Sequence, residues 1–378
     1  MHRPRLRGQK RMSGKMTISE VTVRCFEIPT DRPESDGTLE WTHTGVITVQ
    51  LKAGDAIGFG LTYAGFSTAR LIQEQLVSLL HGQDPMAIPE LHAKLGQSIR
   101  NIGRDGVAAT AVSAVDLALW DLKGKLLGVS LADLLGAARD RMPIYGSGGF
   151  TSYSIQELQE QLGGWAAAGI QWVKMKVGRE PDRDPERVRA ARSAIGAGTG
   201  LFVDANGAYD VRQAVTLGEK FNNDARIVWF EEPVSSDDLA GMRFVRDHLP
   251  APVQVAAGEY GYDLDYFRRF LEAEALDVLQ ADITRCGGVT GFMAIASLAE
   301  AFHKPLSSHC APALHVAVGC AAPTFRHAEY FHDHVRIERM LFENAPEPVG
   351  GTLVPAWDEP GLGLHPQLKA IESHEKSF

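Results

Sequence analysis

The pattern of apolar and polar positions divides the chain into two unlike parts. Two stretches rich in β-branched residues, 18–28 and 45–63, predict a sheet near the N-terminus. Helices are predicted next by apolar residues at three- and four-residue spacing, over 68–82, 88–101 and 106–128. We therefore predict an α+β domain over residues 17–139.

From Met142 the pattern changes to short apolar strands that alternate with amphipathic helices, as in parallel βα units. Seven strands are predicted, in MPIYGSG, WVKMKVG, GLFVDANG, IVWFEEP, VQVAAGE, LDVLQADIT and KPLSSHC. Their spacing is close to the roughly 30 residues per unit of a (β/α)8 barrel, although no eighth strand is clearly marked. We predict a barrel over 140–341, a disordered leader or a misassigned start over 1–16, and a Pro/Gly-rich segment over 342–378 that packs back on the first domain.

Composition and charge narrow the function. The chain has 378 residues, of which 44% are hydrophobic and 22% charged, so it is globular rather than disordered. Its net charge of −9 argues against nucleic acid or an anionic membrane as a partner. No apolar stretch approaches the ~20 residues of a membrane span. The four cysteines lie far apart without a CxxC pair, which favours a reducing compartment. We expect a cytoplasmic protein that acts on a small molecule.

Carboxylates follow three consecutive predicted strands. Asp204, Glu231 and Glu259 stand at the ends of these strands, one βα unit apart. In a parallel barrel the ends of neighbouring strands meet at one face, so the three side chains should converge there. Such a group of hard oxygen donors would repel itself unless a divalent cation neutralised it, and it suits Mg²⁺. The spacing therefore predicts a magnesium site.

Two lysines and a histidine supply candidate bases. Lys174 and Lys176 are two positions apart in WVKMKVG, so their side chains point to the same face, where we expect mutual repulsion to lower their pKa values. His309 ends the seventh predicted strand, and Asp282 ends the sixth. A carboxylate bonded to one imidazole nitrogen fixes the tautomer and makes the other nitrogen a general acid or base.

These motifs resemble the enolase superfamily, and within it the mandelate racemase subgroup. The resemblance rests on VKMKVG, VDANGAY, FEEP, AAGE, ADITRCGGVTG and SSH, in that order and at barrel spacing, over nearly the whole chain. It implies an α+β capping domain over a (β/α)7β modified TIM barrel. It also implies that Asp204, Glu231 and Glu259 hold Mg²⁺, and that the protein is a homo-oligomer.

The resemblance implies further roles. Lys176 is one catalytic base, and Lys174 is its charge partner, which also reaches toward the substrate carboxylate. His309 and Asp282 form the opposing dyad. Glu329 in RHAEYF matches an acid that hydrogen-bonds the substrate carboxylate.

Substrate contacts are expected from polar residues around this site. Within FEEP the family's metal ligand matches the first glutamate, which leaves Glu232, with Asn206, as a candidate for substrate binding. The polar stretch 30–45 is predicted to be a capping loop that sets specificity. The candidates within it are Arg32, His43 and Thr44 as hydrogen-bonding groups and Trp41 as an apolar anchor.

Two reactions fit this set of residues. Both begin with loss of the proton α to a carboxylate, whose developing negative charge Mg²⁺ and Lys174 would stabilise. If the second base protonates a β-hydroxyl, water leaves and a 2-keto acid forms; if it returns a proton to carbon, the enzyme is a racemase or epimerase. The polar loop favours a sugar-acid or aldarate dehydratase. A binding protein without turnover is disfavoured because both candidate bases are present, and a metal-dependent amidohydrolase because MPIYGSG lacks HxH.

Overall fold

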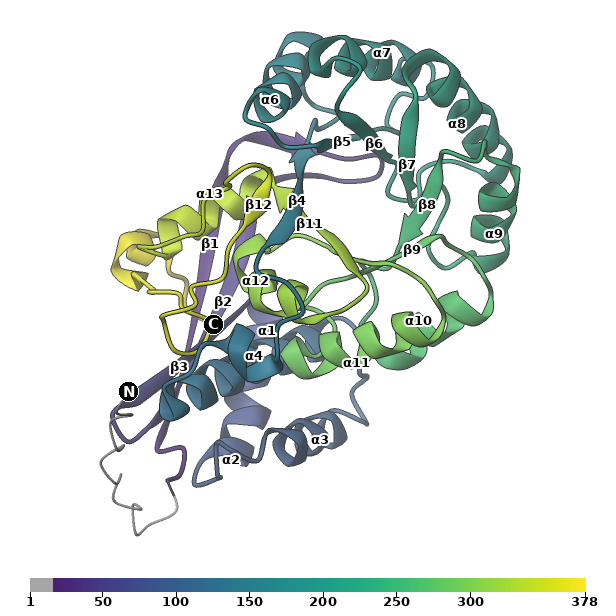
Figure 1. The fold of residues 1–378 in the computed structure, drawn as a ribbon. Helices are drawn as coiled ribbons and strands as arrows, with labels where there is room; N and C mark the ends of the chain where they lie inside the picture. The colour runs from purple at the N-terminus through teal and green to yellow at the C-terminus, as the bar shows by residue number, and fades with distance from the viewer. Residues whose placement is uncertain (1–15) are drawn as a thin grey trace, which may run out of the picture.

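The computed structural model describes residues 16–378, which form an N-terminal α+β domain and a barrel (Figure 1). The predicted leader, except Met16, lies outside the described residues. The N-terminal sheet is antiparallel, with strands β1 (Glu20–Ser35), β2 (Glu40–Ala53) and β3 (Ala56–Tyr63) in that order. The helical elements of this domain are α1 (Phe66–Leu71), η1 (Ile72–Leu76), α2 (Val77–Leu80), α3 (Ile88–Ser98), α4 (Val107–Leu127) and α5 (Leu131–Leu135).

Close packing of α4 on β3 depends on two glycines. Gly58 and Gly60 lie two positions apart and so face the same side of the strand, against Ala114 and Ala118 one helical turn apart on α4. A Cβ atom at either glycine would collide with the helix backbone. The pair of glycines therefore lets the helix approach the sheet closely.

The prediction of a loop over residues 30–45 is wrong. β1 continues to Ser35 and β2 begins at Glu40, so most of residues 30–45 form a β-hairpin rather than a loop. The stretch 45–63, predicted to belong to the sheet, contains the end of β2 and all of β3. The polar side chains of 30–45 concealed the strands because they follow no alternating apolar pattern. We call residues 29–44 the capping hairpin.

The second part is a closed parallel barrel. Its strands are β4 (Met142–Gly148), β5 (Trp172–Lys176), β6 (Gly200–Asp204), β7 (Ile227–Glu231), β8 (Gln254–Ala257), β9 (Val278–Ala281), β10 (Leu306–Ser308) and β11 (Phe325–Phe331), with β11 paired to β4. The helices between and after them are α6 (Ile155–Ala167), α7 (Asp184–Ile195), α8 (Val211–Ala225), α9 (Leu239–His248), α10 (Leu264–Glu272), α11 (Gly288–Ala301), α12 (Pro312–Ala321) and α13 (His332–Leu341). The predicted TIM-type barrel with an α+β capping domain is confirmed.

The eighth strand, which the sequence did not mark clearly, is β11. It contains RHAEYF, where Arg326, His327 and Glu329 interrupt the apolar pattern. His327 lies among aromatic rings of the barrel interior, and Glu329 bonds Lys174. The polar residues His327 and Glu329, which obscured the strand in the sequence, therefore make polar and aromatic contacts inside the barrel.

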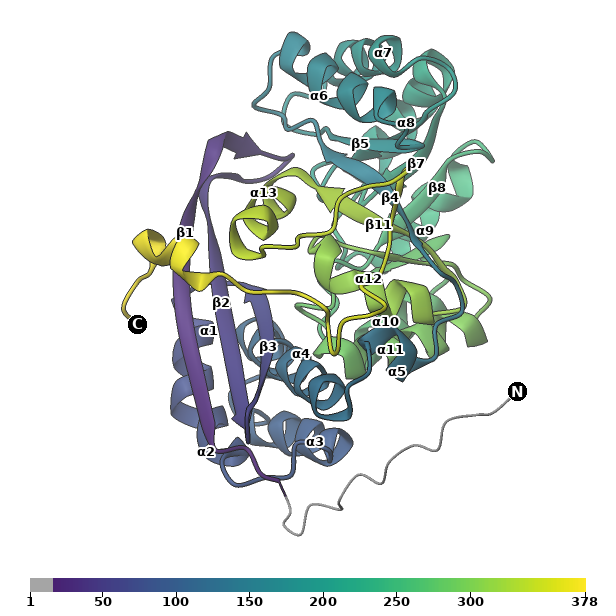
Figure 2. The same ribbon diagram turned by 60° about the vertical axis from the view of Figure 1, so that its left-hand side comes forward.

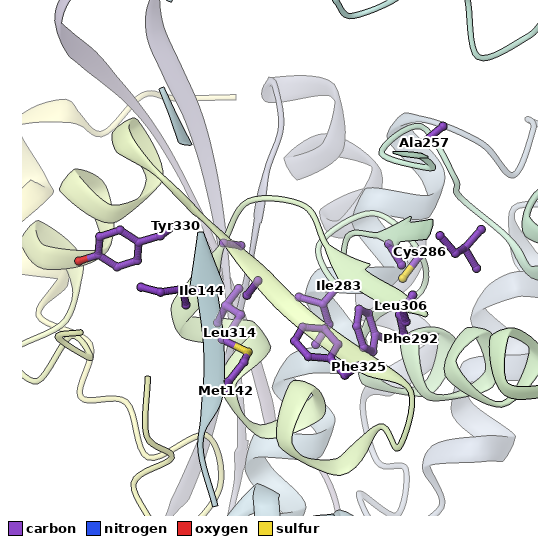
Figure 3. Close-up of a cluster of buried hydrophobic side chains, with 14 of the residues drawn as sticks. Met142, Ile144, Ala257, Ile283, Cys286, Phe292, Leu306, Leu314, Phe325 and Tyr330 are labelled. Carbon is purple, nitrogen blue, oxygen red and sulfur yellow. The ribbon is translucent and has the colours of Figure 1, made fainter. Parts of the chain in front are cut away.

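Two apolar layers hold the barrel together. Inside it, below the strand ends, the rings of Tyr145, Phe202 and Trp229 pack on one another. Outside it, alternate strand residues such as Met142 and Ile144 pack with side chains of the surrounding helices (Figure 3). The scaffold under the strand ends is thus filled with side chains and is not a pore.

The chain after the barrel returns to the N-terminal domain (Figure 2). β12 (Thr352–Leu353) pairs with β4, and the 3-10 helix η2 (Leu368–His374) lies beside β1. Glu375 forms an ion pair with Arg24 of β1, with 2.5 Å between Nη2 and Oε2. Over the described range, no helix combines the length and apolar character needed to cross a membrane.

Candidate active site

Strand register brings three carboxylates together at one end of the barrel. Asp204 and Glu231 are the last residues of β6 and β7 and are paired directly across the sheet. Glu259 follows β8, whose Ala256 is paired with Glu231. Each of the three offers a ligand atom within 4.8 Å of the others, and all three are buried. The convergence expected from the spacing is present.

These carboxylates have the properties of a divalent-cation site. Oε2 of Glu259 is buried without a hydrogen-bond partner. Burial and the neighbouring Asp204 carboxylate raise the pKa of Glu231 well above its usual range, and they outweigh the opposing effect of Lys174. Three close carboxylate oxygens are the kind of ligand that Mg²⁺ prefers.

The two lysines of β5 lie against the same carboxylates. Nζ of Lys174 is fully buried, 2.5 Å from Oε1 of Glu231 and 2.8 Å from Oε1 of Glu329. Nζ of Lys176 is 2.6 Å from Oδ2 of Asp204 and donates to Oδ1 of Asn206 at 3.0 Å. Both side chains therefore point into the barrel mouth rather than into solvent.

The expected fall in the lysine pKa values is wrong for this structure. Burial lowers the pKa of Lys176 and Lys174 lowers it further, but the carboxylates of Asp204, Glu259 and Glu329 together outweigh them and the net change is upward. For Lys174 the carboxylates of Glu231 and Glu329 likewise outweigh burial and raise the pKa. Repulsion between two ammonium groups is a smaller effect than attraction to the carboxylates that the fold brings beside them.

A histidine and an aspartate meet on the opposite side. Ser308 of β10 is paired with Ala281 of β9, so His309 and Asp282, the next residue of each strand, are neighbours. Nδ1 of His309 is 2.7 Å from Oδ2 of Asp282. The other oxygen of Asp282 accepts from the backbone and hydroxyl of Thr284, both at 2.7 Å. Burial acts to raise the pKa of Asp282, but the hydrogen bond from His309 and its charge hold it below the usual range.

This arrangement orients the imidazole. A charged carboxylate only accepts hydrogen bonds, so Nδ1 of His309 carries the proton and Nε2 is left to react. Nε2 lies 3.7 Å from Oε2 of Glu259 and 3.9 Å from Oε2 of Glu329. The reactive nitrogen of His309 therefore faces the carboxylate group from the end of β10, while Lys176 faces the same group from β5.

Replacing Asp282 by asparagine is expected to lower kcat by roughly 10- to 100-fold with little change in KM, because the amide can hold His309 in the wrong tautomer. Steady-state kinetics on the Mg²⁺-loaded protein measure both constants. Asp282→Glu should restore part of the loss, since it returns the carboxylate. A Thr284→Val variant is the control, because it removes a partner of Asp282 without touching the imidazole. Equal kcat values for Asp282→Asn and the wild type would contradict a positioning role.

Three other predicted residues lie at the rim of this group. Oε1 of Glu329 accepts from Ser147 Oγ at 2.6 Å, and Oε2 accepts from the backbone N–H of Cys310 at 2.8 Å. Asn206 and Glu232, two positions and one position after their strands, have positive φ angles of 46° and 36°. Oε1 of Glu232 has no hydrogen-bond partner. Asn206 lies against Lys176 and Glu329 against Lys174, and burial and then the charge of Glu259 raise the pKa of Glu232. All three residues are therefore neighbours of the carboxylate group.

The predicted residues of the capping hairpin separate into two sets. The ring of Trp41 meets Phe150 edge-on at 5.8 Å and packs with the cluster that includes Cys310, beside His309. Arg32 instead pairs with Glu157 on α6 at 2.9 Å, and His43 is exposed beside Glu27. Thr44 donates to Asp333 of α13. Contacts with the carboxylate group are thus absent for Arg32, His43 and Thr44 in this structure.

One neighbour of the site was missed. Sγ of Cys310 is buried 3.2 Å from Nε2 of His309, and burial together with Glu329 raises the pKa of the thiol. The signal in the sequence was its position directly after His309, but without a fold the side chain could equally have pointed away.

Comparisons with known proteins agree with this geometry. A family model described as "Mandelate racemase / muconate lactonizing enzyme, N-terminal domain" matches residues 20–136, and one described as "Enolase C-terminal domain-like" matches residues 157–370. The chain is 32% identical to L-talarate/galactarate dehydratase of Salmonella typhimurium over 83% of this chain and 81% of that protein. It is 33% identical to 3,6-anhydro-alpha-L-galactonate cycloisomerase of Streptomyces coelicolor over 92% of this chain and 96% of that protein.

Solved structures show the same fold. A mandelate racemase/muconate lactonizing enzyme-like protein from Rubrobacter xylanophilus has a TM-score of 0.93 and 48% identity, covering 95% of this chain and 100% of that one. A racemase from Streptomyces coelicolor A3(2), solved with bound magnesium, has a TM-score of 0.89 and 29% identity, covering 95% of this chain and 100% of that one.

Proposed function

The chain belongs to the mandelate racemase/muconate lactonizing enzyme family of the enolase superfamily, and on that premise we propose that it removes the proton α to a carboxylate with the help of Mg²⁺. The reaction we favour is dehydration of a sugar acid or aldarate to a 2-keto-3-deoxy acid. The observation that carries this proposal is the position of Lys176 and His309 on opposite sides of one carboxylate group.

In this proposal Asp204, Glu231 and Glu259 hold the metal ion. Mg²⁺ bound there would supply positive charge that stabilises the charge developing on the substrate carboxylate. Lys174 adds a fixed positive charge at the same place, since its ammonium group is buried against Glu231 and Glu329. The charge is thus in position before the proton moves.

The two bases divide the chemistry. One of them, Lys176 or His309, removes the α-proton, and the other donates a proton to the β-hydroxyl as the C–O bond breaks and water leaves. The resulting enol then takes up a proton at carbon to give the 2-keto acid. Glu329 and Asn206 lie where they can orient the substrate, the first beside Lys174 and the second beside Lys176.

A polar substrate is favoured by the residues around the site. Asn206 and Glu232 present polar groups at the strand ends. The relatives named dehydratases act, by name, on talarate, galactarate, arabinonate and gluconate. A polyol acid matches such a site better than an aromatic hydroxy acid does.

A racemase, epimerase or cycloisomerase is the alternative. Two bases on opposite faces of one carbon are also what inversion at that carbon needs, and cycloisomerases are among the relatives at 29% and 33% identity. These reactions share the first proton transfer with dehydration and differ in where the second proton goes.

A sugar-acid library, incubated with the Mg²⁺-loaded protein in D2O, separates these outcomes. Dehydration releases a 2-keto acid that a carbonyl reagent detects. Deuterium at the α-carbon of recovered substrate without 2-keto acid would exclude dehydration and favour racemisation or epimerisation. Lactones and anhydro sugar acids are therefore included in the library, and their conversion to an isomer of equal mass would favour a cycloisomerase.

A further inference from the structure

A second group of metal-ligating side chains lies where the capping hairpin meets the barrel. Asp31 and Glu34 belong to β1, and His332 begins α13 directly after β11. Each offers a ligand atom within 4.8 Å of the others. Oδ2 of Asp31 is 3.2 Å from Nε2 of His332. The group therefore joins the two domains and shares no residue with the carboxylates of the active site.

One carboxyl oxygen of Glu34 lacks a hydrogen-bond partner. Its side chain is fully buried; Oε2 accepts from Nε1 of Trp41 at 2.9 Å, and Oε1 has no hydrogen-bond partner. Burial, and then the negative charges of Asp333 and Asp31, raise the pKa of Glu34 to about 8. A buried carboxyl group beside two other carboxylates is poorly satisfied unless a cation is bound.

Nearby arginines do not fill this need. Arg32 points to Glu157 on α6, at 2.9 Å. Arg336 donates to Asp333 at 2.6 Å and to the backbone oxygen of Pro29 at 2.7 Å. Neither forms an ion pair with Glu34 or Asp31 among the described residues.

The donor set selects the kind of cation. An imidazole nitrogen with two carboxylate oxygens suits Zn²⁺ and related transition metals, whereas Mg²⁺ prefers oxygen alone. Ligands at about 2.0–2.1 Å around a tetrahedral ion are separated by roughly 3.4 Å, close to the separation of Asp31 and His332. We propose that Asp31, Glu34 and His332 bind a divalent transition-metal cation, with Zn²⁺ as its probe, that fastens the capping hairpin to the barrel.

Such a cation would act at the entrance to the active site. His332 follows β11 and Phe150 follows β4, and these two strands are neighbours whose ends lie at the same face as Asp204 and Glu231. The hairpin already contacts this face through Trp41 against Phe150 and through Ser35 O, which accepts from the backbone N–H of Thr151 at 2.8 Å. A metal bridge would restrict opening of the capping hairpin over the active site. This role is separate from the proposed reaction.

Zinc titration by calorimetry, with the active site saturated with Mg²⁺, tests the proposal. We expect one Zn²⁺ per chain at Asp31, Glu34 and His332 in the wild type. Glu34→Gln and His332→Gln, both near-isosteric, should each weaken binding at least about tenfold. His365→Gln is the matched control, because His365 also lies beside a carboxylate, Glu359, at 3.4 Å but is exposed and has no buried third ligand. Its zinc affinity should equal that of the wild type.

Two further variants separate this site from the catalytic one. His309, Cys310 and Glu329 are also close enough to bind a thiophilic ion, so the titration is repeated with Cys310→Ser, in which the site at Glu34 should remain. Zinc binding should also survive Glu231→Gln, so a failure of the proposed reaction leaves this test intact. Zinc should slow hydrogen exchange of residues 29–44 in the wild type and not in Glu34→Gln.

The proposal is overturned if the wild type binds no Zn²⁺ beyond what Cys310→Ser abolishes. Equal affinity in Glu34→Gln and the wild type would overturn it too. Either result would leave His332 and Asp31 as a simple ion pair. Circular dichroism of each variant confirms that a loss of binding is not a loss of fold.

Discussion

Lys176→Ala is expected to lower kcat by about 10²- to 10⁴-fold, the range that a positioned acid or base contributes. The reason is geometric, because the Lys176 ammonium group lies directly against Asp204 and Asn206 at the mouth of the barrel. Steady-state kinetics on a sugar acid from the library screen measure the effect. Lys176→Met keeps most of the stem and should lose as much, which separates loss of the amine from loss of packing.

Controls for this variant are available in the chain. Lys220 is also paired with a carboxylate, Asp224 at 3.9 Å, but lies half-exposed on α8, so Lys220→Ala should retain wild-type kcat. Removing Lys176 leaves Asp204 without its closest cation, so Mg²⁺ affinity should not fall. Near-full activity of Lys176→Ala on every active substrate would remove Lys176 from the mechanism.

His309→Asn is the second large effect, with an expected loss in kcat of about 10²- to 10⁴-fold. Asparagine can still contact Asp282 but has no nitrogen that exchanges a proton near neutral pH. Only small changes in the melting temperature are expected, because the shape of the side chain is partly kept. A variant that turns over at the wild-type rate would show that His309 is not an acid or base here.

Isotope exchange then divides the roles of the two residues. In D2O, the variant that lacks the proton donor should still exchange the α-proton of its substrate while releasing no 2-keto acid. The variant that lacks the α-base should do neither. Exchange in both variants, or a dehydration product from either at the wild-type rate, would contradict an assignment of one step to each residue.

Much of this site could be predicted from the sequence because the barrel converts spacing into proximity. Asp204, Glu231 and Glu259 follow consecutive strands, and parallel register alone makes their side chains converge. The same argument placed His309 beside Asp282. The strand pattern and the parallel register of neighbouring barrel strands were enough to predict both groups of residues.

The predictions that were wrong concern properties that depend on residues distant in the sequence but close in space. The lysine pKa values depend on carboxylates from β6, β7 and β11, which the spacing of Lys174 and Lys176 cannot weigh. The capping hairpin was predicted as a loop because its polar side chains mask the strands. Glu34 is fully buried under Trp41, a position that a polar stretch does not indicate.

The central claim is that Asp204, Glu231 and Glu259 form the metal site, and Mg²⁺ titration of the metal-free protein by calorimetry tests it most directly. FEEP offers a matched pair of variants, since Glu231 belongs to the carboxylate group and Glu232 does not. We predict one Mg²⁺ per chain in the wild type, affinity reduced at least about tenfold in Glu231→Gln, and affinity close to wild type in Glu232→Gln. Unchanged affinity in Glu231→Gln would contradict the account.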